Sequence, residues 1–128
     1  MNGAVYVGNW EHGKANGKGW FFHPDGSVHK GDWLNDKAHG QGHYWCKSGY
    51  KYKGGWDSDQ KSGFGEETLE DGSFYTGQFL EDCKHGKGYY RWVNGYSYKG
   101  MWEYDTMSGE GTYKWIDGKT YIGIWKNN

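Results

Sequence analysis

Short aromatic segments alternate with polar stretches along the chain at a fixed interval of 23 residues. Each segment reads aromatic, variable, glycine, variable, aromatic. The copies span residues 6–10, 29–33, 52–56, 75–79 and 98–102, with a last partial copy at 121–125. Because side chains two positions apart share one face of a strand, this pattern predicts a strand with both large residues and the glycine on one side. A fixed period of this length is typical of a repeat array, whose units bury their faces against each other.

A second strand is predicted in each copy, after a polar loop. The loop, residues 11–16 in the first copy, is followed by Gly-x-Gly and then by an aromatic-rich run such as residues 20–23. Each run ends in a turn dipeptide: Asp25-Gly26, Ser48-Gly49, Asp71-Gly72, Asn94-Gly95 or Asp117-Gly118. Asp-Gly and Asn-Gly pairs favour the type I′ turns of hairpins. We therefore predict an all-β fold over residues 1–128, an elongated single-layer antiparallel sheet of consecutive β-hairpins with about five and a half repeats.

Composition indicates an aromatic core. The mean hydropathy of -1.11 is low enough to suggest disorder in an ordinary chain. However, nine Trp, twelve Tyr and five Phe supply large apolar surfaces, whereas only four Val, three Ile and three Leu are present. The glycine inside each aromatic segment recurs in all six copies, which indicates a fixed backbone geometry. We expect an aromatic ring of an adjacent strand to lie across it.

Charge and cysteine usage narrow the function classes. Fifteen basic and sixteen acidic residues are interspersed, so no nucleic-acid footprint is present and no nucleic-acid partner is expected. Cys46 and Cys83 occupy different repeat positions and are predicted to be free thiols rather than a disulfide framework. With no apolar signal region and no membrane-length apolar stretch, we expect a cytoplasmic protein. Neither end resembles a specialised cap, so we expect end-to-end association, coverage by a partner, or a longer protein of which this is a part.

The phased motif resembles the MORN repeat (membrane occupation and recognition nexus). The motif is Tyr-x-Gly-x-Trp, then Gly-x-Gly, then Asp-Gly or Asn-Gly, and it departs from the family pattern at His29 and Phe79. The resemblance implies an elongated, twisted sheet with a groove, and a non-catalytic scaffold. It also implies association with cytoskeletal structures or with membrane junctions.

Phospholipid binding by a peripheral membrane module is the alternative function, and it is not favoured. Lys14 and Lys37 keep the lysine often found in the polar loop, but Gln60, Cys83 and Thr106 replace it elsewhere. Acidic residues in the same loops offset the remaining positive charge. Attachment to a membrane generally needs both apolar insertion and electrostatic attraction.

Three other kinds of site have weak sequence support. Metal binding would need four ligands, typically in two short pairs, but the candidate residues do not pair in this way: His39, His43, Cys46, Cys83 and His85. The carboxylates at positions 57, 59, 66, 67, 70 and 71 lie in predicted turns, loops or strand edges, and no nucleophile motif accompanies them. Carbohydrate-binding hairpin repeats have similar composition, but they are secreted and fit the phasing less well. We expect no enzyme activity, no metal and no cofactor.

Two aromatic rows are the candidate functional residues. We expect the row that opens each copy to line a concave groove with partly exposed ring edges, and to bind a partner helix or peptide: Tyr6, His29, Tyr52, Tyr75, Tyr98 and Tyr121. We expect the row that closes each copy to form the structural core: Trp10, Trp33, Trp56, Phe79, Trp102 and Trp125. Another copy of the chain, paired through the open sheet edges, is the alternative partner.

Overall fold

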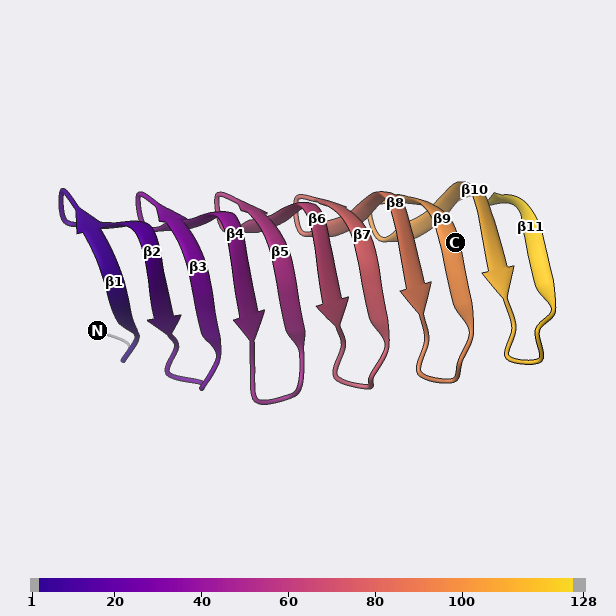
Figure 1. The fold of residues 1–128 in the computed structure, drawn as a ribbon, viewed down its shortest axis with the longest axis horizontal. Helices are drawn as coiled ribbons and strands as arrows, with labels where there is room; N and C mark the ends of the chain where they lie inside the picture. The colour runs from indigo at the N-terminus through magenta and orange to yellow at the C-terminus, as the bar shows by residue number, and fades with distance from the viewer. Residues whose placement is uncertain (1–2, 126–128) are drawn as a thin grey trace.

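Eleven strands form one open antiparallel sheet in the computed structural model, which describes residues 3–125 (Figure 1). The strand order in the sheet follows the sequence from β1 to β11. The strands are β1 (Val5–Glu11), β2 (Lys14–Phe22), β3 (Val28–Leu34), β4 (Lys37–Trp45), β5 (Lys51–Asp57), β6 (Gln60–Thr68), β7 (Phe74–Leu80), β8 (Cys83–Arg91), β9 (Ser97–Glu103), β10 (Thr106–Lys114) and β11 (Thr120–Trp125). The predicted all-β single-layer sheet of hairpins is confirmed.

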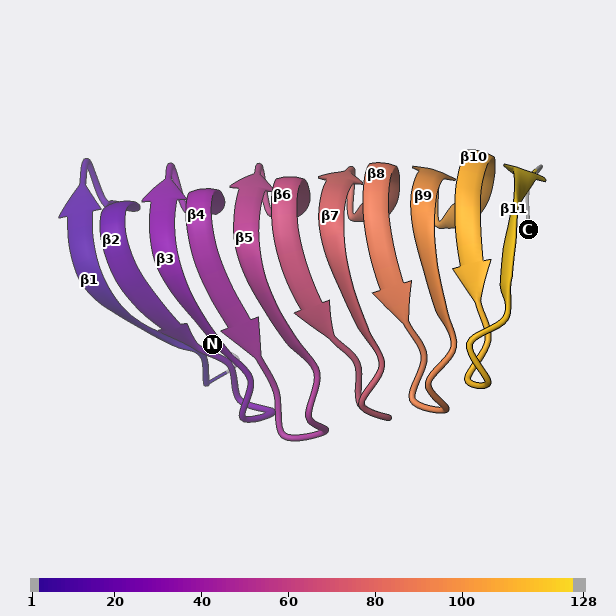
Figure 2. The same cartoon turned by 45° about the vertical axis from the view of Figure 1, so that its right-hand side comes forward.

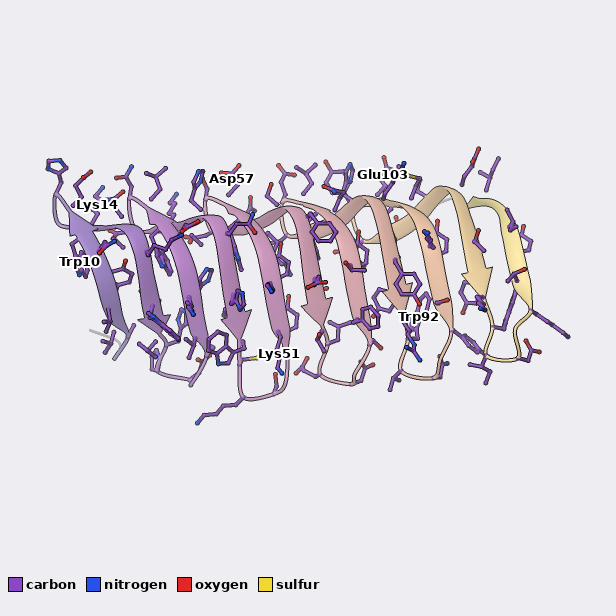
Figure 3. All side chains as sticks on the ribbon, in the orientation of Figure 1. Trp10, Lys14, Lys51, Asp57, Trp92 and Glu103 are labelled. Atoms are coloured by element: carbon purple, nitrogen blue, oxygen red, sulfur yellow. The ribbon has the colours of Figure 1, made fainter. Side chains whose placement is uncertain are left out.

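The predicted polar loop is wrong, because most of that stretch is strand. Residues 14–16 open β2, and a turn of only two residues joins β1 to β2. The equivalent turn between β3 and β4 places both Asn35 and Asp36 at positive φ, 48° and 71°. Two consecutive left-handed residues define the type I′ turn, which matches the twist of the strands it joins. Figure 3 shows Lys14, Asp57 and Glu103 at this end of the strands, with Lys51 and Trp92 toward the other.

The Asp-Gly dipeptides form a different turn from the one predicted. Gly26 has positive φ (94°), whereas Asp25 does not. The amide of Gly26 donates to the carbonyl of His23 at 3.0 Å, and the amide of Ser27 donates to the carboxylate of Asp25 at 2.8 Å. This arrangement is typical of a type I turn followed by a left-handed glycine. The aspartate is selected here for its side-chain hydrogen bonds rather than for a left-handed backbone.

A β-bulge interrupts the pairing inside each hairpin and bends the strands. The register between β5 and β6 shifts between Gly54 and Trp56, and equivalent shifts recur in the other hairpins. A Cβ on Gly54 would lie 2.6 Å from the carbonyl oxygen of Phe64 on the facing strand. Backbone from the next strand, and not the ring that we expected, is therefore what requires glycine here. Bulges bend the strand that contains them, and the curvature is visible in Figure 2.

The core lies on one face of the sheet and is aromatic, as predicted. Alternation places the opening and closing rings of each copy on one face, and a single layer buries that face only by curving around it. The buried rings are Trp33, Tyr52, Tyr75, Phe79, Tyr98 and Trp102. They pack edge to face, with ring centroids 5.1 Å apart for Tyr52 and Phe79 and 5.6 Å apart for Tyr75 and Trp102. Such pairs add about 0.5–1.5 kcal/mol each to the free energy of burial.

Candidate functional site: the concave aromatic groove

Ring hydrogen bonds tie the repeats together along the concave face. The hydroxyl of Tyr52 donates to the carbonyl of Gly55 at 2.9 Å, three residues along its own strand. The indole Nε1 of Trp56 donates to the carbonyl of Gly42, in the preceding repeat, at 3.2 Å. The same two bonds recur in other copies, for Tyr6, Tyr75, Tyr98, Trp33 and Trp102. The tyrosine fixes its own bulge, and the tryptophan joins neighbouring repeats.

The central members of the opening row are buried, so the expectation that their ring edges are exposed is wrong for them. Tyr52, Tyr75 and Tyr98 are 0–1% exposed and His29 is 5% exposed. Each tyrosine ring lies over a glycine of the facing strand; a Cβ on Gly65 would overlap the ring of Tyr52. Burial raises the pKa of all three hydroxyls. Towards the ends of the sheet, Tyr6 is half-buried and Tyr121 is exposed.

The closing row is buried only in part. Trp33, Phe79 and Trp102 are buried, and Trp56 is half-buried. Trp10 lies on the outermost strand with 56% of its surface exposed. The side chain of Trp125 lies outside the described part of the structure.

The exposed lining of the groove comes from residues that the sequence analysis did not single out. Each residue of the opening row lies opposite a residue on the even-numbered strands beside it, so the row continues across all the strands. The complete row is Tyr6, Phe21, His29, Tyr44, Tyr52, Glu67, Tyr75, Tyr90, Tyr98, Tyr113 and Tyr121. The second-strand rings at positions 21, 44, 90 and 113 are half-buried, so they present edges to the groove. Their spacing of 23 residues was a signal for this role.

Glu67 is the one carboxylate in this aromatic row, and it is neutralised from within the chain. Its Oε2 accepts a hydrogen bond from the hydroxyl of Tyr50 and pairs with Nζ of Lys61 at 2.9 Å. Burial and the Glu67 carboxylate raise the pKa of the Tyr50 hydroxyl. Nζ of Lys61 also lies 5.4 to 5.7 Å from the ring centroids of Tyr50, Tyr52 and Phe79. The groove therefore holds an ammonium group among rings, where cation–π attraction stabilises it.

A second lysine enters the groove in the next repeat. Nζ of Lys84 lies 5.8, 5.5 and 5.4 Å from the rings of Tyr75, Tyr90 and Trp102, and 3.2 Å from the carboxylate of Asp105. Its ammonium is therefore directed into the protein, not toward a surrounding lipid surface.

Two repeats earlier, the groove contains a hollow of about 310 Å³. Aromatic residues and two carboxylates line it: Phe21, His23, His29, Trp33, Tyr44, Trp56, Asp36 and Asp59, with Ala38 at its base. The imidazole of His29 lies 4.8 and 4.4 Å, centroid to centroid, from the rings of Trp33 and Trp56. Burial lowers the pKa of His29 to about 4, so the imidazole is neutral at pH 7.

The outer face has a different character. Alternation turns Trp20, Phe22 and Tyr89 away from the core, next to charged residues such as Lys30 and Lys99. Nζ of Lys30 lies 4.8 Å from the ring of Trp20. A hollow of about 710 Å³ on this face has Tyr89 and Lys99 in its lining, together with Phe64, Met101 and several polar and glycine residues.

Residues 3–125 contain neither a cluster of metal-ligating side chains nor a membrane-spanning helix. Among the described residues, no cluster of three or more His, Cys, Asp or Glu side chains is placed to hold a metal ion. Cys83 lies beside Asp105, and burial together with that carboxylate raises the pKa of its thiol. No helix in residues 3–125 is long and apolar enough to cross a membrane.

Comparison with known proteins identifies the family. The model of the MORN repeat matches residues 6–28, 29–49, 52–74, 75–95 and 98–120. The chain belongs to the MORN repeat family. Proteins of this family are generally non-catalytic repeat scaffolds, and the chain has that repeat architecture.

Solved structures with the same fold include the TCP domain of SAS-4 (dCPAP) from Drosophila melanogaster, in complex with a proline-rich motif of Ana2 (dSTIL). The TM-score is 0.53 at 11% sequence identity, over 86% of the MORN repeat chain. The match spans 61% of that chain's length. The comparison with curated proteins gave no match.

Proposed function

We propose that the chain is a non-catalytic repeat scaffold whose concave groove binds a segment of a partner protein. The row of inward-facing residues across all eleven strands, aromatic at every position except Glu67, supports this proposal. Its buried tyrosines form a rigid floor, and the half-buried rings of Tyr44, Tyr90 and Tyr113 offer edges to a ligand. Tyrosine and tryptophan are the side chains that most often anchor protein partners, since they bury much surface at low entropic cost.

The TCP domain of SAS-4 is compatible with this function. That domain is in complex with a proline-rich motif, so a protein of this fold accommodates a peptide. The likeness concerns the fold alone. For the MORN repeat chain it supports a protein segment as the class of ligand, and the residues that bind are proposed from its own groove.

A matched pair of tyrosines tests which face binds the partner. Tyr90 faces the groove, and its neighbour Tyr89 lines the hollow on the outer face. The partner is identified by pull-down with the unaltered protein and mass spectrometry. We expect Tyr90→Ala to lose binding to this partner and Tyr89→Ala to retain it. Near-ultraviolet circular dichroism and the Tm of each variant report whether the sheet is intact. Loss of the partner with Tyr89→Ala alone would place binding on the outer face and contradict the proposal.

A membrane role has a separate test. Sedimentation with anionic vesicles at low ionic strength should leave the protein in the supernatant, because Lys84 is directed into the groove and Lys18 is paired with Asp32. Salt-sensitive co-sedimentation would instead favour the phospholipid-binding alternative.

A further inference from the structure

One inward-facing position is alanine in the first two repeats, lysine in the next two and methionine in the fifth. It is the second residue of each even-numbered strand, and its occupants are Ala15, Ala38, Lys61, Lys84 and Met107. In β6 and β8 the lysine at this position places its ammonium over the rings of the groove. Lys61 and Lys84 therefore show that the rings of this groove can surround an ammonium group.

The hollow above Ala38 has the same walls as the lysine site in β8. His29, Tyr44 and Trp56 occupy the repeat positions of Tyr75, Tyr90 and Trp102, which surround the ammonium of Lys84. Asp59 occupies the position of Asp105, whose carboxylate pairs with that ammonium. With alanine in place of lysine, the rings and the carboxylate remain but the chain supplies no cation.

His29 completes these walls with a neutral ring. The residue is 5% exposed, and its Nε2, which has no hydrogen-bond partner, is buried over Gly42 of the facing strand. The imidazole therefore takes the place of the tyrosine ring of the β8 site, and the charge that attracts an ammonium comes from Asp59.

We infer that this hollow binds the ammonium of a lysine side chain presented by the partner segment. The inference rests on the proposed function, because it places the partner in the groove. Ring faces and a carboxylate together suit a primary ammonium, which carries both charge and N–H donors. A quaternary ammonium satisfies the rings but has no N–H for Asp59. A neutral aliphatic chain provides neither a charge for the rings nor a donor for the carboxylate.

Titration with a small probe tests the inference without knowledge of the partner. The probe is N-acetyl-lysine methylamide, followed through the indole N–H signals of Trp33 and Trp56 in a two-dimensional nitrogen–proton NMR spectrum. We expect saturable shifts at these two signals, and no saturable shifts with N-acetyl-norleucine methylamide, the uncharged analogue. We expect tetramethylammonium to bind more weakly by about tenfold, because it lacks hydrogen-bond donors.

One variant should fill the hollow, a second should open an equivalent hollow in another repeat, and a third is the control. Ala38→Lys gives β4 the residue that β8 has, so the chain's own ammonium should fill the hollow and abolish probe binding. Gln41→Lys adds the same charge to the exposed outer side of β4 and should leave probe binding unchanged. Lys84→Ala should open the equivalent hollow and add a second set of shifts at Trp102.

The outcomes separate this inference from the proposed function. Equal binding of the norleucine analogue, stronger binding of tetramethylammonium, or unchanged binding in Ala38→Lys would overturn it. So would the absence of lysine-probe binding to the folded protein. If the probe fails while Tyr90→Ala still removes the partner, the groove binds a segment without this lysine. If the probe binds while Tyr90→Ala and Tyr89→Ala both retain the partner, the groove assignment fails and the ammonium site stands.

Discussion

At the scale of single residues, His29 is where the repeat departs most from its own chemistry. The other copies place a tyrosine here, and in those at positions 52, 75 and 98 the hydroxyl donates to a carbonyl three residues further on. The imidazole leaves Nε2 buried and unpartnered. An unpaired buried nitrogen costs free energy, so we expect this departure to destabilise the fold locally.

The substitution His29→Tyr should stabilise the protein and reduce its sensitivity to acid. The folded pKa of His29 is about 4, lowered by burial from 6.5, so the unfolded chain binds a proton between these values and the folded protein does not. Stability that is complete above pH 6.5 is therefore lost as the pH falls towards 4, by on the order of 3 kcal/mol. Urea unfolding from pH 7.5 to 4.5 measures this loss. Parallel pH profiles for wild type and His29→Tyr would contradict the assignment.

The glycines beneath the tyrosine rings should be far less replaceable than other glycines of the same strand. A Cβ on Gly65 overlaps the ring of Tyr52, whereas a Cβ on Gly63 meets open space, although Gly63 has a φ of 76°. We expect Gly63→Ala to cost about 1–2 kcal/mol of backbone strain. Gly65→Ala should cost more than that, because it displaces a core ring. Chemical denaturation compares the two, and equal costs would show that the ring does not require the glycine.

At the scale of elements, each type I′ turn after the first is bonded to the repeat before it. The amide of Asp82 donates to the carbonyl of Lys61 at 3.1 Å, and the amide of Lys61 donates to the carboxylate of Asp82 at 2.8 Å. Equivalent side-chain bonds hold Asp36, Asp59 and Asp105. The aspartate thus combines a tolerated left-handed backbone with a link between hairpins.

Substitutions of Asp82 should separate these two contributions. Asp82→Gly keeps the positive φ and loses the side-chain bond, so it should cost about 1–3 kcal/mol for the unpaired amide and the added chain entropy. Asp82→Asn keeps both an acceptor oxygen and the left-handed backbone, and should cost less. Asp82→Ala loses both and should cost most. Thermal unfolding gives the order, and a Gly variant as stable as Asn would mean that the bond contributes nothing.

The elements were predictable from the sequence, but their details were not. The 23-residue period and the turn dipeptides were enough for the hairpins and the aromatic core. The type I′ turns were predicted at the Asp-Gly dipeptides, whereas they lie at the opposite end of the strands. Asp-Gly suits both a type I′ turn and a type I turn followed by a left-handed glycine, so the dipeptide alone does not decide between them. The exposure of Tyr52 was wrong because the bulge brings Gly65 beneath its ring, and no single-strand pattern encodes that approach. The change from alanine at position 38 to lysine at position 84 can be read in the sequence, but its meaning depends on the residues that surround the two side chains.

At the scale of the whole molecule, cohesion passes between neighbouring repeats. In residues 3–125 the sheet is a single open layer in sequence order, so each repeat touches the next and no second layer reinforces them. Stability should then be close to a sum of repeat and interface contributions, and an altered interface should act locally. The groove is one continuous surface built from units that can loosen separately.

Trp102→Ala should therefore loosen one end of the sheet and leave the other intact. Trp102 is 5% exposed, packs against Tyr75 and Tyr98, and donates to the carbonyl of Gly88. Truncating a buried tryptophan costs about 3–5 kcal/mol. Hydrogen exchange followed by mass spectrometry should show faster exchange in β8 to β10 and unchanged exchange in β2 to β4. Trp20→Ala, on the outer face, is the control. It should change hydrogen exchange only slightly, in β2 and the strands paired with it. If Trp102→Ala accelerates exchange equally in every strand, the sheet unfolds as one cooperative unit, and the description by neighbouring interfaces fails.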